Sequence, residues 1–261
     1  MQKNKTKKEN LILVHSFPTN SIVLAGLVEF LDDYFHVYFI DLPGFTKKTP
    51  LEKGRISLAS YSKYLSEKIK EFNLDSYIIG GISFGFVVVN NMKPDAKKCK
   101  AILAIEPYLN NKFVHMSLFQ RFLYAYFFTG RVMPKISKKF WESPHAEQLF
   151  GYVLGRHNKL TTIVAEVDAR TFFDTAKILF KNSKKVTFHT RIPYVLWINK
   201  HDTTINADKI VAEFEKNVPR LLVKYNDVDH YPRDMSKRYF KSKIKEKDIM
   251  DSIAWINSCY S

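Results

Sequence analysis

Three residues of this chain have the types that acyl transfer to a serine requires: Ser83, Asp202 and His230. A serine hydroxyl is a weak nucleophile until a neighbouring base takes its proton, and histidine is the usual base. The histidine in turn needs a carboxylate that fixes its tautomer and stabilises its cation. The residue types therefore indicate a nucleophile, a base and an acid, provided that the fold brings these distant positions together.

The serine lies in a Gly-x-Ser-x-Gly pattern made by Gly81, Ser83 and Gly85, between two apolar runs. This spacing predicts a strand that turns sharply into a helix, with the serine at the apex. The glycines permit the tight backbone and the close approach of helix and strand. The pattern alone also occurs by chance in loops, and a non-catalytic protein can keep the turn, so the interpretation depends on partners elsewhere in the chain.

Alternating strand-like and helix-like segments would position these residues. Short apolar runs predict strands over 11–15, 37–40, 77–82, 101–105, 194–198 and 221–225. Apolar spacing and helix-start signals predict helices over 21–32, 57–72, 84–92, 207–216 and 247–256, with Ser57 as an N-cap. Strands that alternate with helices predict an α/β protein with a parallel sheet and right-handed crossovers.

The alternation stops between Tyr108 and Thr190, where helix-like segments are rich in Phe, Tyr, Lys and Arg and no clear buried strand is found. We interpret residues 108–190 as an inserted helical cap, and residues 1–107 and 191–261 as the core. The aromatic run 117–128 has two interpretations, the core of a lid helix or an apolar wall for an acyl or alkyl group. One helix can serve both purposes.

Polar residues follow the carboxyl ends of the predicted strands, where ligands bind in open parallel sheets. They are His15 to Pro18 after the first strand, Ser83 after the third, Glu106 after the fourth, Asp202 after the fifth and His230 after the sixth. Glu106 is an alternative acid to Asp202, or else a turn residue beneath the cap. Among the other histidines, His201 is interpreted as a loop residue, and His15 is expected to order the first loop.

With these motifs the chain resembles the α/β-hydrolase superfamily over nearly its whole length. The residues that carry the resemblance are the elbow 81–85, the acid loop 199–205, the histidine loop 229–232 and the first loop His15-Ser16-Phe17-Pro18. The resemblance implies that the backbone N–H groups of Phe17 and Phe84 form an oxyanion hole for the tetrahedral intermediate.

The chain departs from the family pattern at a few positions. Ser16, Asn199 and Asp229 stand where the family often has glycine. The usual antiparallel N-terminal strands are not expected, so the resemblance implies a mostly parallel sheet of about six strands with a helical cap.

Composition narrows the class of protein. The net charge of +15 favours anionic partners, but lysine is abundant throughout the chain and the basic residues are spread out, so no specific nucleic-acid binding is expected. The two cysteines, Cys99 and Cys259, fit neither a metal site nor a disulfide framework. No apolar stretch reaches the length of a membrane span, so we expect a cytoplasmic protein.

The residues and the resemblance together predict a serine hydrolase of carboxylic esters or lactones with small to medium apolar acyl groups. The catalytic residues would be Ser83, Asp202 and His230, and no metal or organic cofactor is expected. A carbon–carbon bond hydrolase, an acyltransferase and a perhydrolase are alternatives on the same residues. An alternative of another class is a non-catalytic ligand-binding homologue, and the sequence leaves the substrate and the oligomeric state open.

Overall fold

A parallel sheet forms the centre of the computed structural model, which describes residues 8–51, 54, 56–117, 119–120, 122, 126, 133–143, 145–146, 162–182, 186–230 and 232–260. The strand order is β2-β1-β3-β4-β5-β6, and every neighbouring pair is parallel. The strands are β1 (Glu9–Val14), β2 (Phe35–Ile40), β3 (Tyr77–Ile82), β4 (Cys99–Ile105), β5 (Tyr194–Asn199) and β6 (Leu221–Asn226). The predicted α/β fold with a parallel sheet of about six strands is therefore confirmed.

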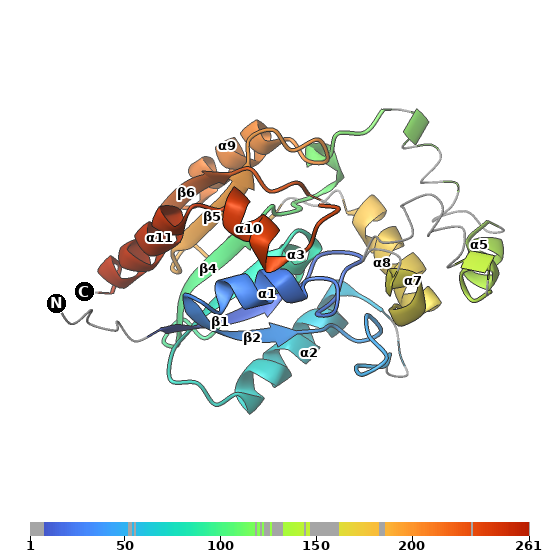
Figure 1. Cartoon of the computed structure of the whole chain (residues 1–261), viewed down its shortest axis with the longest axis horizontal. Coiled ribbons are helices and arrows are strands. Elements are labelled where there is room, and N and C mark those ends of the chain that lie inside the picture. The colour runs from blue at the N-terminus through green and yellow to red at the C-terminus, as the bar shows by residue number, and fades with distance from the viewer. Residues whose placement is uncertain are drawn as a thin grey trace.

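Helices pack on both faces of this sheet (Figure 1). In that view α1 (Ala25–Leu31) and α10 (Lys237–Lys243) lie in front of the sheet and contact each other, while α3 (Phe84–Asn91) lies behind it. Helix α3 packs against α2 (Leu58–Glu71), which begins at the predicted Ser57 N-cap with a capping box. The remaining core helices are α9 (Ala207–Asn217) and α11 (Glu246–Ser258).

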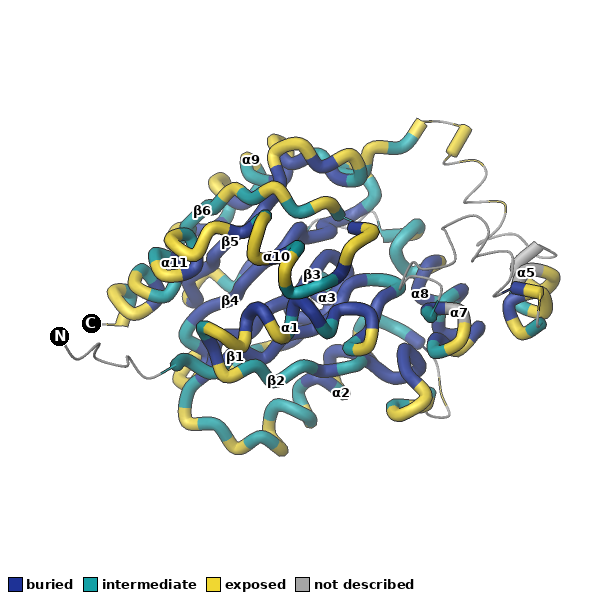
Figure 2. Tube along the Cα trace, in the orientation of Figure 1, coloured by how far each residue is buried: buried dark blue, intermediate teal, exposed yellow. Residues whose placement is uncertain are grey.

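The core is densest along the central strands (Figure 2). All residues of β3 and β5 are buried, whereas the edge strands β2 and β6 are largely half-buried. Strands that are covered by helices on both faces read as continuous apolar runs, and this is why the sequence predicts them well. Within the described part of the chain, no helix is long and apolar enough to cross a membrane.

The described part of the chain between β4 and β5 consists of helices and irregular segments, with one isolated bridge between Val114 and Ile205. It contains η1 (Asn111–Phe113), α5 (Met133–Trp141), α7 (Thr162–Glu166) and α8 (Ala169–Lys181). Of these, α5, α7 and α8 lie at the end of the molecule opposite α11 (Figure 1). Most of the aromatic run 117–128 lies outside the described residues, and Phe119 and Phe122 within it are exposed.

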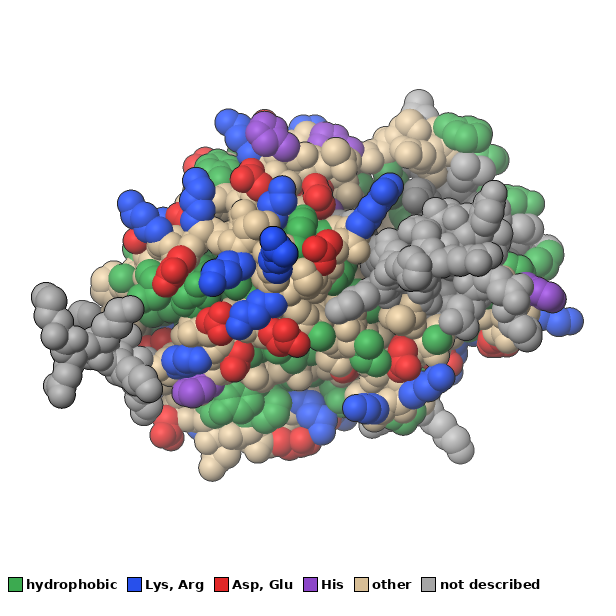
Figure 3. Space-filling view, in the orientation of Figure 1, with side chains coloured by type: hydrophobic (Ala, Val, Ile, Leu, Met, Phe, Trp, Pro, Cys, Tyr) green, Lys and Arg blue, Asp and Glu red, His purple; other side chains and the backbone are tan. Residues whose placement is uncertain are grey.

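Charged side chains of both signs are mixed on the face in Figure 3, where Lys and Arg alternate with Asp and Glu over the front helices. Some of them pair across elements, as Lys237 does with Asp33 at 2.7 Å. Exposed pairs of this kind contribute little to stability. Whether any surface binds an anionic partner stays a prediction.

Candidate active site

The turn between β3 and α3 has the geometry that the Gly-x-Ser-x-Gly pattern predicts. Ser83 lies at its apex with φ 48° and ψ −108°, a conformation that L-residues rarely adopt. A Cβ on Gly85 would come within 2.5 Å of the carbonyl oxygen of Val14 and 2.6 Å of that of His15. A Cβ on Gly81 would overlap the backbone of Phe86. Both glycines are therefore required by the close packing of α3 against β1 and β3.

The structure brings together the three residues whose types suggested acyl transfer. The hydroxyl Oγ of Ser83 lies 3.1 Å from Nε2 of His230, and Nδ1 of His230 lies 2.9 Å from Oδ2 of Asp202. The side chains of His230 and Asp202 are 4% and 0% exposed, so water does not compete for these bonds. Hydroxyl, imidazole and carboxylate thus form one hydrogen-bonded line that starts at the elbow.

The carboxylate of Asp202 is held by its own loop. Oδ1 accepts the backbone N–H groups of Thr204 at 2.5 Å and Ile205 at 2.9 Å, which leaves Oδ2 for His230. Burial raises the pKa of Asp202, but the hydrogen bond and charge of His230 and the two N–H groups outweigh burial, so that the net pKa lies below its usual value. Asp202 is therefore an ionised carboxylate in the folded protein.

Glu106, the alternative acid, lies beside this line and is not part of it. It follows β4 with φ 43° and is 4% exposed. Its Oε1 accepts the backbone N–H of Asn199 at 2.6 Å and the side-chain amide of Asn226 at 3.2 Å. Burial, and then the charge of Asp202, raise the pKa of Glu106 well above its usual value.

The first loop is fixed by His15, as the sequence predicts. The buried imidazole donates from Nδ1 to the carbonyl of Ser16 at 2.8 Å and accepts at Nε2 from the N–H of Leu42 at 3.0 Å. Burial lowers the pKa of His15, which keeps it neutral and suited to this pair of bonds. His15 is thus committed to the loop, and it makes no bond to Ser83 or Asp202.

Of the two residues of the implied oxyanion hole, Phe17 belongs to the first loop and Phe84 to the elbow. The ring of Phe17 packs edge-on against the ring of Phe84, with centroids 6.5 Å apart. Phe84 is the first residue of α3, so its N–H has no carbonyl partner within the helix. This arrangement places both residues next to Ser83, and their role as donors stays a prediction.

A pocket of about 330 Å³ opens beside Ser83 and His230. It is lined mainly by apolar side chains of the first loop, of the segment after β4 and of α8. Its lining includes Phe17, Tyr108, Phe172, Leu179 and Phe180. Helix α8 supplies aromatic residues to this wall, and whether residues 117–128 contribute to it as well stays a prediction.

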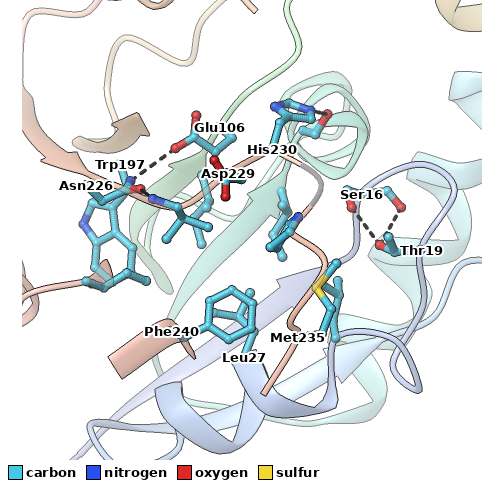
Figure 4. Close-up of a pocket in the computed structure, with 17 residues that line it drawn as sticks. Ser16, Thr19, Leu27, Glu106, Trp197, Asn226, Asp229, His230, Met235 and Phe240 are labelled. Atoms are coloured by element: carbon cyan, nitrogen blue, oxygen red, sulfur yellow. Dashed lines mark hydrogen bonds between the residues drawn. The ribbon is translucent and has the colours of Figure 1, made fainter. Parts of the chain in front are cut away.

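A second cavity, of about 40 Å³, is also lined by Ser83 and His230, and Figure 4 shows it in close-up. His230, Glu106 and Asp229 lie along one side of it, and Phe240 of α10, Leu27 and Met235 lie along the other.

The donor atoms of Glu106, Asp202 and His230 lie within 4.8 Å of one another, a set that could in principle hold a metal ion. The imidazole is already engaged on both nitrogens, by Asp202 and Ser83. A metal would have to displace the Asp202 bond, so the donor set fits proton transfer better than metal binding.

Sequence reasoning missed several residues that shape the site. Asn226 at the end of β6 and Asn199 at the end of β5 hold Glu106, and Tyr108 ties the segment after β4 to α8. The sequence signal that could have identified them is their position at or just after the carboxyl ends of the predicted strands. Asp229 points elsewhere, since it binds the hydroxyl of Tyr239, and His201 is exposed.

Comparison with solved structures supports the fold at low sequence identity. An esterase from Thermogutta terrifontis is 15% identical, with a TM-score of 0.63 over 98% of this chain and 92% of its own. The enol-lactonase from Burkholderia xenovorans LB400 is 11% identical, with a TM-score of 0.63 over 98% and 94%. A bottromycin epimerase is 16% identical, with a TM-score of 0.57 over 86% and 85%. Because these proteins differ in activity, the likeness establishes the fold alone.

No curated protein matches the sequence. Residues 9–232 match the family described as alpha/beta hydrolase fold, which spans the sheet from β1 to the histidine loop. The chain therefore belongs to the alpha/beta hydrolase fold family.

Proposed function

We propose that this protein is a serine hydrolase of carboxylic esters or lactones, with Ser83 as nucleophile, His230 as base and Asp202 as acid. The observation that carries the proposal is the unbroken line of hydrogen bonds from Ser83 Oγ through both nitrogens of His230 to Asp202. A buried imidazole oriented by a carboxylate is the arrangement that activates a serine hydroxyl.

The geometry supports a two-step reaction. Ser83 Oγ attacks the carbonyl carbon while Nε2 of His230 takes the hydroxyl proton, and Asp202 stabilises the imidazolium through Nδ1. His230 then returns the proton to the leaving alcohol, or to the ring oxygen of a lactone, and the acyl group remains on Ser83. Water, deprotonated by the same nitrogen, attacks the acyl-enzyme and releases the acid and free Ser83.

Negative charge develops on the carbonyl oxygen in both steps. The N–H groups of Phe17 and Phe84 are the donors proposed to receive it, because the two residues lie next to the serine and α3 begins at Phe84. Loss of one such donor typically costs about 3 kcal/mol of transition-state stabilisation.

The pocket of about 330 Å³ supports a substrate with one apolar group of small to medium size. Its walls include Phe172, Leu179 and Phe180, which offer dispersion contacts and no charge. We therefore expect the preferred esters to carry an uncharged acyl or alkyl group on this side.

The test is hydrolysis of p-nitrophenyl esters of increasing acyl length, together with a lactone panel, by wild type and by Ser83→Ala. We expect Ser83→Ala to reduce kcat/KM at least 1000-fold, since the nucleophile is lost. Ser62→Ala is the matched control, because Ser62 is also a buried serine but its hydroxyl binds the carbonyl of Val88. Hydrolysis by Ser83→Ala at the wild-type rate would overturn the mechanism.

Labelling by a fluorophosphonate separates catalysis from simple ligand binding. A hydrolase of this design should be labelled at Ser83, and a ligand-binding homologue without an active serine should not. Product analysis with an added alcohol or hydrogen peroxide then distinguishes hydrolysis from acyl transfer or perhydrolysis.

A further inference from the structure

The carboxyl group of Glu106 lies next to the proposed acid, and its two oxygens have unequal surroundings. Oε1 accepts two hydrogen bonds, from Asn199 and Asn226. Oε2 is fully buried and has no hydrogen-bond donor facing it in the described part of the chain. One oxygen therefore behaves as a carbonyl, and the other is left as the site for a proton.

The neighbouring carboxylate explains where that proton would be held. The donor atoms of Glu106 and Asp202 lie within 4.8 Å of each other, and both side chains are buried. Two buried carboxyl groups at this separation share one negative charge, because a second charge is neither solvated nor paired. Asp202 keeps the charge, since it alone binds His230 and the N–H groups of its loop.

The other ionisable groups around Glu106 do not alter this assignment. His230, after β6, faces the same point and is bonded to Asp202. Asp229, the next residue upstream, lines the small cavity but is exposed to solvent. No lysine or arginine lines that cavity among the described residues, so no cation there favours an ionised Glu106.

We propose that Glu106 is held as a neutral carboxylic acid whose Oε2–H group points to Asp202, and that it becomes the ionised partner of His230 when the Asp202 carboxylate is removed. Glu106 is thus a positioning residue in the wild-type protein and a reserve acid in its variants. The turnover part of this proposal rests on the proposed hydrolase function, but the protonation of Glu106 does not.

Two substitutions separate these roles. Glu106→Gln keeps an acceptor for Asn199 and Asn226 and a donor toward Asp202, so it imitates the neutral acid but can never ionise. Asp202→Ala removes the neighbouring charge and leaves Nδ1 of His230 without its carboxylate, so Glu106, although buried, should lose its proton and pair with the imidazolium. Asp202→Asn serves if the alanine variant does not fold, because it keeps an oxygen for the N–H groups of Thr204 and Ile205.

Infrared difference spectroscopy tests the protonation directly and needs no substrate. At pH 7 we expect a neutral-carboxyl C=O band in wild type that is absent in Glu106→Gln. In Asp202→Ala that band should be replaced by a carboxylate band, which in turn disappears in the double variant. A wild-type spectrum without a neutral-carboxyl band sensitive to Glu106→Gln would overturn the proposal.

The rate of fluorophosphonate labelling, with kcat/KM alongside it, tests the reserve role. Glu106→Gln alone should change either rate by less than about threefold, whereas the same change in the Asp202→Ala background should lower it at least tenfold. The labelling rate of Asp202→Ala should also fall more steeply at acid pH than that of the double variant, because only the single variant has a Glu106 carboxylate to protonate. An equal effect of Glu106→Gln in both backgrounds would show a merely structural role and overturn the reserve acid.

These readouts keep the two proposals distinguishable. If the infrared bands appear as expected but no ester or lactone is cleaved, the hydrolase function fails and the neutral Glu106 stands. If esters are cleaved but the bands are absent, the hydrolase function stands and the neutral Glu106 fails.

Discussion

The hydroxyl of Tyr108 donates to the backbone carbonyl of Leu179 over 2.7 Å. This bond, with the bond from Asn111 to the carbonyl of Phe180 at 3.0 Å and that from Asn182 to the carbonyl of Leu109 at 3.3 Å, fastens the C-terminal end of α8 to the segment after β4. Helix α8 forms a wall of the large pocket. The pocket therefore depends on a set of local hydrogen bonds as well as on apolar packing.

Tyr108→Phe should loosen this wall. The carbonyl of Leu179 loses its donor, so we expect the free energy of unfolding to fall by about 1 kcal/mol. We also expect KM for longer esters to rise several-fold with little change in kcat. Tyr194→Phe is the matched control, because the Tyr194 hydroxyl binds Asn90, away from the pocket, at 2.9 Å. An equal rise in KM for both variants would contradict this interpretation.

Phe172→Ala should change the preference for acyl length. The Phe172 ring lies between Trp141 at 4.1 Å and Phe17 at 5.1 Å, measured between centroids, and it lines the pocket. Its loss enlarges the pocket beside the first loop, so longer esters should gain several-fold in kcat/KM relative to acetates. Phe173→Ala, the neighbouring change outside the pocket lining, should cost about 3–5 kcal/mol of stability and leave the preference unchanged.

Gly85→Ala should impair catalysis through the backbone. The added Cβ meets the carbonyl oxygens of Val14 and His15, which cannot rotate away, so the first loop must move. We expect kcat to fall at least tenfold and stability to fall by about 1–3 kcal/mol. Gly80→Ala is the control, because its Cβ meets the end of the flexible Leu13 side chain at 2.9 Å. Steady-state kinetics and thermal unfolding of both variants test this prediction. A fully active Gly85→Ala would contradict it.

His15 and Glu106 should make opposite contributions to the pH dependence of stability. Burial lowers the pKa of His15 from 6.5, so below pH 6.5 the unfolded chain binds more protons than the folded chain. The free energy of unfolding therefore decreases as the pH falls below 6.5. The pKa of Glu106 is raised above 4.5, so its contribution is complete below 4.5 and is lost as pH rises toward its folded value.

Denaturant unfolding of two variants between pH 5 and 7 separates these contributions. Glu106→Gln removes the contribution of Glu106 and leaves that of His15. The free energy of unfolding should therefore decline on acidification more steeply than in wild type. In His15→Gln the decline should be weaker or reversed. Each group changes the slope by at most about 1.4 kcal/mol per pH unit. Identical slopes in the three proteins would contradict both assignments.

The sheet and the reactive residues could be predicted from the sequence because each depends on local patterns. Buried strands read as apolar runs, and the chemistry-bearing residues follow them directly. Helix α10 could not be predicted in this way. Its sequence is basic and buries only Phe240, and its position depends on Gly26 of α1, where a Cβ would overlap the backbone at Met235. Contacts so distant in sequence leave no periodic signal.

The sequence favours Asp202 as the acid but keeps Glu106 as an alternative for a related reason. Asp202 and Glu106 both follow strands and are both carboxylates, and only their hydrogen bonds tell them apart. His230 binds the first, and two asparagines bind the second. Whether residues 117–128 also line the pocket stays a prediction, because aromatic content alone marks that run and α8 equally well and most of the run lies outside the described residues.

The left-handed backbone of Ser83 has a consequence for protein engineering. A serine held at φ 48° carries strain of about 1–3 kcal/mol, which glycine at the same position would release at a smaller entropic cost. A library selected only for folding or heat resistance should therefore enrich glycine at position 83 and discard the hydroxyl. Any attempt to stabilise this protein by selection needs a simultaneous screen for labelling or turnover, since the residue proposed to react is also one that weakens the fold.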